Sequence, residues 1–190
     1  MNWANRITLS RLGLTVVFVL ALNSSWQYAR TTALVIFLIA GLTDFVDGEI
    51  ARRYGNVTNF GKLMDPLVDK IMTMSAFVCL VSLGSIPAWA VIVILSREFL
   101  ITGLRLIAAV RGKVLAAERL GKLKTICQIV TILYCLVLVA LIDRFGRLLN
   151  PPTVTSLNVV GLTLVLLTVG LTLWSGISYF AKNWDLVSEL

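Results

Sequence analysis

Residues 43–70 read TDFVDGEIARRYGNVTNFGKLMDPLVDK, and this stretch holds half of the acidic residues of the protein. They are Asp44, Asp47, Glu49, Asp65 and Asp69. Successive residues of a helix turn by about 100°. On that spacing Asp44 and Asp47 share one face of a first helix, from which Glu49 points away. Asp65 and Asp69 share one face of a second helix, which runs antiparallel after a polar turn. We therefore expect the four aspartates to meet at similar depth, inside the two helices and away from the turn.

Apolar sequence surrounds this polar stretch on both sides. The chain has 190 residues, of which 58% are hydrophobic and 14% are charged, and its mean hydropathy is +0.90. A soluble domain usually carries about 45–50% apolar and about 25% charged residues, so an ordinary cytosolic globule and a disordered chain are both excluded. Apolar runs occupy residues 12–22, 31–51, 66–84, 87–110, 122–142 and 154–180. We predict an all-α integral membrane protein with six transmembrane helices, an N-terminal interfacial helix and a single domain over residues 1–190.

The basic residues are distributed unevenly between the two sides of this predicted bundle. Six spans place both termini on one side, and thirteen Lys and Arg residues fall in the segments of that side. The opposite segments hold only Arg30, Arg144 and Arg147, and Arg97 lies within a span. Because basic segments stay on the cytoplasmic side, both termini and the turn at residues 54–59 are predicted to be cytoplasmic. The net charge of +7 then reflects topology and contacts with anionic lipid or phosphate, with no nucleic acid as partner.

The composition also excludes several kinds of catalytic chemistry. The sequence contains no histidine, so His-based general bases, Ser-His-Asp triads and His-ligated zinc or haem sites are ruled out. The three cysteines, Cys79, Cys127 and Cys135, lie in apolar runs without a paired spacing. We predict that they are small buried hydrophobic residues.

Four converging carboxylates within a membrane protein need cations to offset them. A carboxylate at the centre of a membrane helix costs about 2.5–3.5 kcal/mol, and the four also repel each other. Mg²⁺ or Mn²⁺ prefers carboxylate oxygen, and two such ions fit four aspartates. Gly48 and Ala51 share the aspartate face and leave room for a bulky ligand, for which a diphosphate compound is the natural candidate. Two alternatives remain at this point: a proton or ion pathway, and neutralisation by nearby arginines.

A second group of charges lies further along the chain. Candidates for binding a phosphate are Arg105, Arg111, Arg119, Lys122 and Lys124. Lys122 and Lys124 precede a predicted helix start, where anions bind well. For Arg111 the alternative is topology and anionic lipid contact. Glu98 is predicted to pair with an arginine and lock helix packing.

The aspartate stretch resembles the signature of a known enzyme family. The pattern Asp44-x2-Asp47-Gly48-x2-Ala51-Arg52-x8-Gly61-x3-Asp65-x3-Asp69 is similar to that of the CDP-alcohol phosphatidyltransferase family, with no element missing. The resemblance implies a six-helix membrane fold, homodimeric in most members, with its active site facing the cytoplasm at the cell membrane. It implies that the four aspartates bind two Mg²⁺ or Mn²⁺ ions and that Asp69 is also the general base on the acceptor hydroxyl. The residues implied to bind CDP-diacylglycerol are Asn5, Thr8, Asp47, Gly48, Ala51, Arg52 and Gly61.

Weaker motifs resemble one branch of that family, the bacterial phosphatidylglycerophosphate synthases. They are Asn2-x2-Asn5-x2-Thr8-x2-Arg11, Arg97-Glu98-Phe99-x2-Thr102-Gly103-Leu104-Arg105, Gly121-Lys122-x-Lys124-Thr125 and Ser175-Gly176-x2-Tyr179-Phe180. This implies transfer of phosphatidyl from CDP-diacylglycerol to sn-glycerol 3-phosphate, which is held by the five basic residues named above. Ala4 and Glu49 depart from the usual pattern, which has proline and an apolar or aromatic residue there. The alternatives are another acceptor (inositol phosphate, serine or phosphatidylglycerol) and a carboxylate-based cation transporter.

Overall fold

The computed structural model describes the backbone of residues 3–54, 59–112 and 119–184, and the side chains of residues 10–43, 70–112 and 119–184. Within these ranges the regular secondary structure is α-helical throughout, which confirms the predicted class. The helices are α1 (Trp3–Leu22), α2 (Ala29–Tyr54), α3 (Asn59–Ser82), α4 (Ala88–Val110), α5 (Arg119–Phe145) and α6 (Pro151–Lys182).

The connections at one end of the molecule follow from their turn residues. Gly84 follows α3 with a φ of +71°, a left-handed conformation that glycine adopts without steric cost. Pro87 then caps the start of α4, with a φ of −69° that its ring imposes. Pro151 opens α6 directly after Asn150, where a missing N–H costs nothing because the first helical donors have no partner within the helix.

The N-terminal segment differs from the prediction. We expected an interfacial helix leading into a first span, but α1 runs without interruption from Trp3 to Leu22. No proline lies in this segment, so the hydrogen bonds of the apolar helix continue into the polar residues before it. The two predicted parts are therefore one helix.

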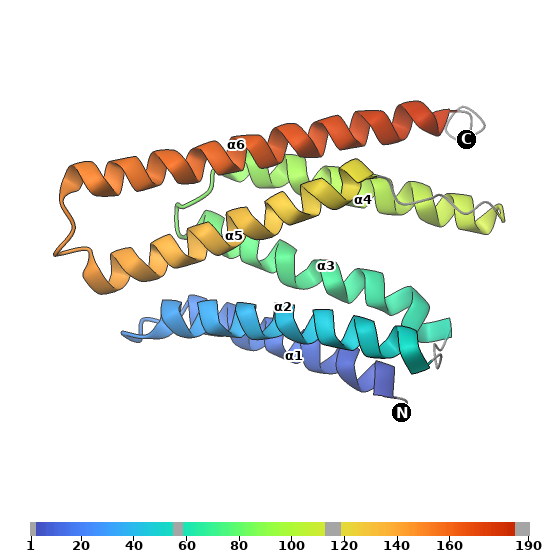
Figure 1. The fold of residues 1–190 in the computed structure, drawn as a ribbon, viewed down its shortest axis with the longest axis horizontal. Coiled ribbons are helices and arrows are strands. Elements are labelled where there is room, and N and C mark those ends of the chain that lie inside the picture. The colour runs from blue at the N-terminus through green and yellow to red at the C-terminus, as the bar shows by residue number, and fades with distance from the viewer. Residues whose placement is uncertain (1–2, 55–58, 113–118, 185–190) are drawn as a thin grey trace.

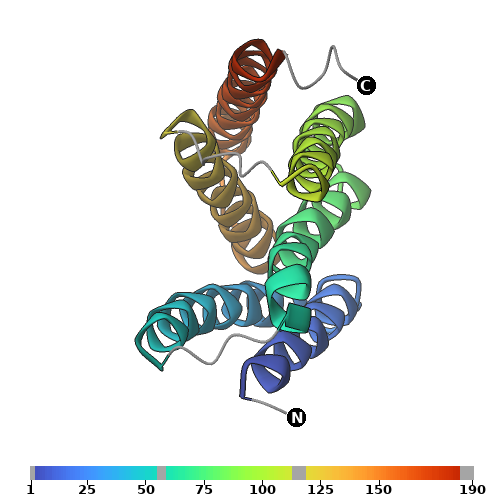
Figure 2. The ribbon, with the colours of Figure 1, turned by 90° about the vertical axis from the view of Figure 1, so that its right-hand side faces the viewer.

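Consecutive helices run in opposite directions (Figure 1). The first turns of α1, α3 and α5 and the last turns of α2, α4 and α6 lie together at one end, which we call the polar end. Figure 2 looks at this end and shows α3 between the pair α1–α2 and the group α4–α6. α3 packs against α1, α4 and α5, and α6 packs against α4 and α5. The segments that carry the predicted site residues thus share the polar end.

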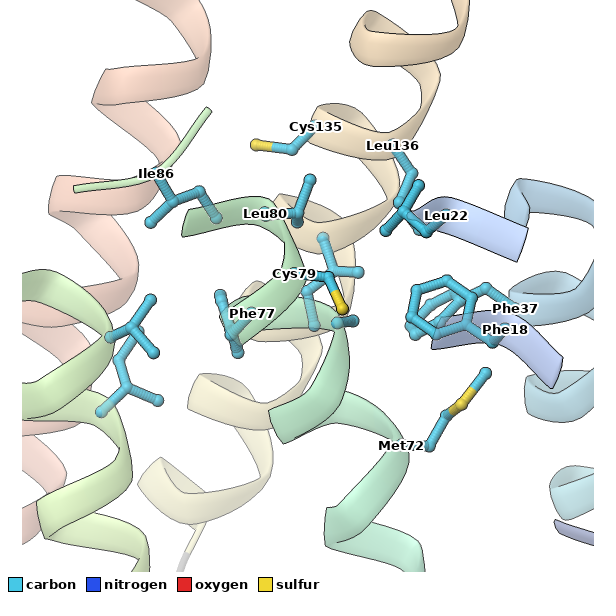
Figure 3. Packing of buried hydrophobic residues seen from close by; sticks show 14 of the residues in the cluster. Phe18, Leu22, Phe37, Met72, Phe77, Cys79, Leu80, Ile86, Cys135 and Leu136 are labelled. Carbon is cyan, nitrogen blue, oxygen red and sulfur yellow. The ribbon is translucent and has the colours of Figure 1, made fainter. Parts of the chain in front are cut away.

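The main apolar core is formed by residues from all six helices, and Figure 3 shows its packing. The rings of Phe18 in α1 and Phe37 in α2 lie 5.8 Å apart between centroids, beside Met72 of α3. Cys79 and Cys135 are buried in the same cluster, as predicted, whereas Cys127 is only half-buried. This cluster forms the apolar centre around which the six helices pack.

Within the residues that the structure describes, two helices are long and apolar enough to cross a membrane, α5 and α6. In the described parts of α1, α2 and α3 the apolar segments are shorter: Ser10–Leu22, Ala29–Thr43 and Lys70–Ser82. Many large apolar side chains on the outside of the bundle are more than half exposed, among them Leu20, Ile92, Leu100, Leu167 and Ile177. Apolar surface this extensive marks a membrane or protein contact rather than a water-exposed face.

Candidate active site

A cavity of about 360 Å³ opens at the polar end between α4, α5 and α6, with one residue from α3. We call it the cationic cavity, because its charged lining residues are Lys70, Arg97, Glu98, Arg105, Lys122 and Lys124. Five positive charges and one negative charge leave a formal net charge of +4. A concave site with this excess of one sign attracts anions.

Glu98 lies at the centre of this charge group and is only 8% exposed. Its Oε1 pairs with the ammonium group of Lys124 from α5, and its Oε2 lies 3.3 Å from Nζ of Lys70 from α3. Nη1 of the adjacent Arg97 lies 3.5 Å from Oε1. One carboxylate therefore joins cations from three helices. We call these four residues the Glu98 cluster.

The composition of the Glu98 cluster explains why its charged side chains can be buried from solvent. A buried charge is strongly unfavourable unless it is paired, and Lys124 is only 3% exposed. Three cations share the carboxylate of Glu98, which is the acidic member of the cluster. All four members of the cluster line the cationic cavity.

Arg105 forms the outer wall of the cationic cavity. Its Nε donates a hydrogen bond of 3.1 Å to the hydroxyl of Tyr179 on α6. Its guanidinium carbon lies 5.4 Å from the centroid of the same ring, within the range of a cation–π contact. Tyr179 is itself buried, so the arginine is held against a rigid ring. This positions a planar, permanently charged donor at the cavity, as binding of a phosphate requires.

A second, smaller cavity of about 180 Å³ lies deeper between α3, α4 and α5. We call it the inner cavity. Lys70, Glu98, Lys124 and Thr125 line both cavities, so the Glu98 cluster separates them. The remaining polar lining of the inner cavity comes from Thr73 and Gln128.

The structure brings together three of the five predicted phosphate-binding residues. Arg105, Lys122 and Lys124 line the cationic cavity, although Lys124 also pairs with Glu98. Arg111 and Arg119 are exposed and are not among its lining residues. The predicted pairing of Glu98 with an arginine is confirmed, but two lysines also take part.

Sequence reasoning missed two contributors to the cationic cavity, Lys70 and Tyr179. The sequence contains a feature that could have pointed to each of these two residues. Lys70 directly follows Asp69, and Tyr179 belongs to a motif already noted near the C-terminus. Neither residue could be assigned to the site without knowing which helices meet at the polar end.

The aspartate stretch lies on the same end of the bundle. Asp44 and Asp47 fall in the second half of α2, and Asp65 and Asp69 fall in the first half of α3. Their side chains lie outside the described residues, as do those of Asn5, Thr8, Gly48, Ala51, Arg52 and Gly61. Among the side chains that the structure does describe, no group of three or more His, Cys, Asp or Glu could hold a metal. Four carboxylates are ligands that suit Mg²⁺ or Mn²⁺. Lys70, which directly follows Asp69 in the sequence, lines the cationic cavity, so the segment that carries Asp65 and Asp69 lies next to this cavity.

Comparison with known proteins places the chain in a family. Residues 1–174 match the CDP-alcohol phosphatidyltransferase family. The chain is 39% identical to the CDP-diacylglycerol–glycerol-3-phosphate 3-phosphatidyltransferase of Bacillus subtilis, over 97% of this chain and 96% of the relative. It is 38% identical to a probable phosphatidylglycerophosphate synthase of Mycobacterium tuberculosis, over 95% of this chain and 81% of the relative. A Rickettsia felis protein with the same name as the Bacillus one is 32% identical, over 94% of this chain and 93% of the relative. The chain belongs to the CDP-alcohol phosphatidyltransferase family.

Proposed function

We propose that this chain transfers the phosphatidyl group of CDP-diacylglycerol to sn-glycerol 3-phosphate, giving phosphatidylglycerophosphate and CMP. The observation that carries the proposal is the cationic cavity, whose lining has a formal charge of +4 and includes the residue after Asp69. Glycerol 3-phosphate carries a dianionic phosphate that the reaction leaves intact. Because the aspartates repel that phosphate, separate cations must hold it, and the cavity supplies them. The names of the three relatives above describe the same reaction.

The donor binds at the aspartate stretch in this proposal. Asp44, Asp47, Asp65 and Asp69 hold two Mg²⁺ or Mn²⁺ ions, which would neutralise the diphosphate of the donor. Asn5, Thr8, Asp47, Gly48, Ala51, Arg52 and Gly61 bind the CDP-diacylglycerol. Support comes from the family signature and from the position of α2 and α3, whose polar segments share one end of the bundle.

Transfer then depends on how this chain places the acceptor. Arg105 and Lys122 bind the acceptor phosphate, which leaves its far hydroxyl to reach the segment of Asp69 and Lys70. A carboxylate oxygen of Asp69 takes the hydroxyl proton. The resulting oxygen forms a bond to the phosphorus that carries the diacylglycerol, and the bond from that phosphorus to CMP breaks. The basic residues that line the cationic cavity lower the cost of bringing the dianion to this site.

The donor also explains the architecture. We propose that all six helices cross the cell membrane, with both termini and the polar end cytoplasmic, and that two copies form a homodimer. The exposed apolar side chains and the alternating helix directions support this arrangement. At the opposite end Arg30 pairs with Asp143, and Arg144 lies over the ring of Tyr28 at 4.8 Å. The acyl chains of the donor then lie in lipid while the acceptor enters from the cytoplasm.

An acceptor competition tests the function. Purified protein is given radiolabelled CDP-diacylglycerol, Mg²⁺ and one of four acceptors: glycerol 3-phosphate, inositol phosphate, serine or phosphatidylglycerol. We expect CMP release to be fastest with glycerol 3-phosphate and to stop when the metal is chelated. Asp69→Asn, which keeps the shape of the side chain but cannot accept the proton, is the matched negative control. Faster release with another acceptor would assign the chain to a different reaction, and full activity after chelation would exclude the metal-dependent mechanism.

A further inference from the structure

The inner cavity contains a buried amide that the proposed chemistry does not use. Gln128 on α5 lines this cavity and is only 6% exposed. Its Nε2 atom has no hydrogen-bond partner among the described residues. A buried amide donor without a partner is costly, and native proteins satisfy nearly all such groups. The position therefore indicates a polar occupant that accepts a hydrogen bond from Gln128.

The rest of the lining indicates the chemistry of that occupant. Thr73, Thr125 and the carboxylate of Glu98 accept hydrogen bonds, and Lys70 donates them. The opposite wall is apolar and consists of Met74, Phe77, Ile94 and Ile129. A hydroxyl group both donates and accepts, and the carbon that bears it can contact an apolar wall. The lining thus suits an alcohol group better than an anion. The basic residues that an anion needs gather instead at the adjoining cationic cavity.

The size and position of the inner cavity fit part of a small acceptor. Its 180 Å³ greatly exceeds the roughly 10–15 Å³ that one water needs. Lys70 and Lys124 line both cavities, so a group bound in the inner cavity lies beside a phosphate bound in the cationic cavity. In glycerol 3-phosphate the secondary hydroxyl lies between the phosphate and the reacting hydroxyl. With the phosphate at Arg105 and the reacting hydroxyl at Asp69, the middle hydroxyl is the group left to face the inner cavity.

We propose that the inner cavity binds the secondary hydroxyl of the acceptor and that Gln128 donates a hydrogen bond to it. This inference rests on the proposed function. It makes Gln128 a specificity-determining residue, because a site built to bond a hydroxyl rejects the analogue that lacks it. Ordered water in the inner cavity, with no contact to the acceptor, is the competing outcome.

The first test needs only the wild-type protein and two acceptors. 3-Hydroxypropyl phosphate keeps the phosphate and the reacting hydroxyl of glycerol 3-phosphate but lacks the secondary hydroxyl. We expect its kcat/KM to be about tenfold lower, the size expected for loss of one hydrogen bond that leaves its buried partner unsatisfied. Equal kcat/KM for the two acceptors would overturn the proposal. Absence of CMP release with either acceptor would instead refute the proposed function, so the two failures are distinguishable.

The second test assigns the discrimination to Gln128. Gln128→Leu keeps the approximate size of the side chain and removes the amide. We expect kcat/KM for glycerol 3-phosphate to fall about tenfold while that for 3-hydroxypropyl phosphate stays within about twofold, so that the ratio approaches one. Equal loss for both acceptors, or an unchanged ratio, would remove Gln128 from the hydroxyl site. Both acceptors are assayed on one preparation, so a partly unfolded fraction cancels from the ratio.

A matched control separates this role from general packing. Thr131 lies one turn further along the same buried face of α5 and bonds to Thr168 at 2.8 Å, outside the lining of both cavities. Thr131→Val removes a buried polar atom without touching the inner cavity. We expect the ratio between the two acceptors to equal that of the wild type. If Thr131→Val also brings the ratio to one, the discrimination arises from helix packing and the proposal fails.

Discussion

Replacing Glu98 by glutamine should strongly destabilise the protein. The substitution keeps the shape of the side chain but removes the only negative charge among the described residues that line the cationic cavity. Lys124 then keeps a buried ammonium group without a counter-ion, beside Arg97, whose side chain is only 11% exposed. Breaking a buried ion pair by removing one partner typically costs about 3–5 kcal/mol.

The structure indicates how that cost divides between the partners. The side chain of Lys70 is 32% exposed, so its pair with Glu98 contributes no more than a screened surface pair, about 0–1 kcal/mol. Most of the loss therefore comes from Lys124, whose side chain is 4% exposed. For a chain of this length, 1 kcal/mol corresponds to about 2–4 °C in Tm, so Glu98→Gln should lower Tm by roughly 6–20 °C.

The buried cysteines provide the assay. Cys79 and Cys135 are free and buried, so a thiol-reactive fluorophore reaches them only when the bundle opens. Cys127→Ala removes the half-buried thiol and its background signal. The matched variant is the double substitution Glu98→Gln with Lys124→Gln, which removes both charges and should recover most of the lost Tm. A Tm for Glu98→Gln within about 2 °C of wild type, or a double variant less stable than the single one, would refute the reasoning.

Three further predictions concern other parts of the molecule. Arg105→Ala should raise the KM for glycerol 3-phosphate by about tenfold to a hundredfold, with little change in the KM for the donor, because charged hydrogen bonds are worth roughly 1.5–3 kcal/mol. Tyr179→Phe removes the 3.1 Å hydrogen bond to Arg105 but keeps the ring. It should have a smaller effect on the KM for glycerol 3-phosphate in the same steady-state assay. Equal loss of donor and acceptor affinity in Arg105→Ala would make its role structural. Asp65→Asn should reduce CMP release by orders of magnitude and weaken Mn²⁺ binding measured by calorimetry, and unchanged Mn²⁺ affinity would remove Asp65 from the metal site. Arg30→Ala breaks the partly exposed pair with Asp143 at the far end, so it should change stability by less than about 1 kcal/mol and leave both KM values unchanged; a change in either KM would show coupling between the two ends.

The helices themselves could be predicted from local sequence. The apolar run 87–110 became α4 (Ala88–Val110), and the runs 122–142 and 154–180 became α5 and α6 with a few additional residues at each end. The additions have one cause: backbone hydrogen bonds continue past the apolar run until a turn residue stops them. Hydropathy therefore marks the part of a helix that avoids water, and glycine, asparagine and proline mark where the helix ends. The fusion of the predicted interfacial helix with α1 follows from the same rule.

By itself, the sequence determined the helical class, the family and the spacing of the aspartates along α2 and α3, because each of these depends on residues close together in the chain. Only the tertiary structure decided which cations share the cationic cavity. Arg111, Arg119 and Lys122 are similar basic residues near one connection, yet only Lys122 lines the cavity. Lys70 and Lys124 reach Glu98 from helices that are distant in sequence, and the amide of Gln128 faces a cavity that none of those helices forms alone. Helix packing sets the distances between such side chains, and packing depends on the whole interface rather than on any local stretch of sequence.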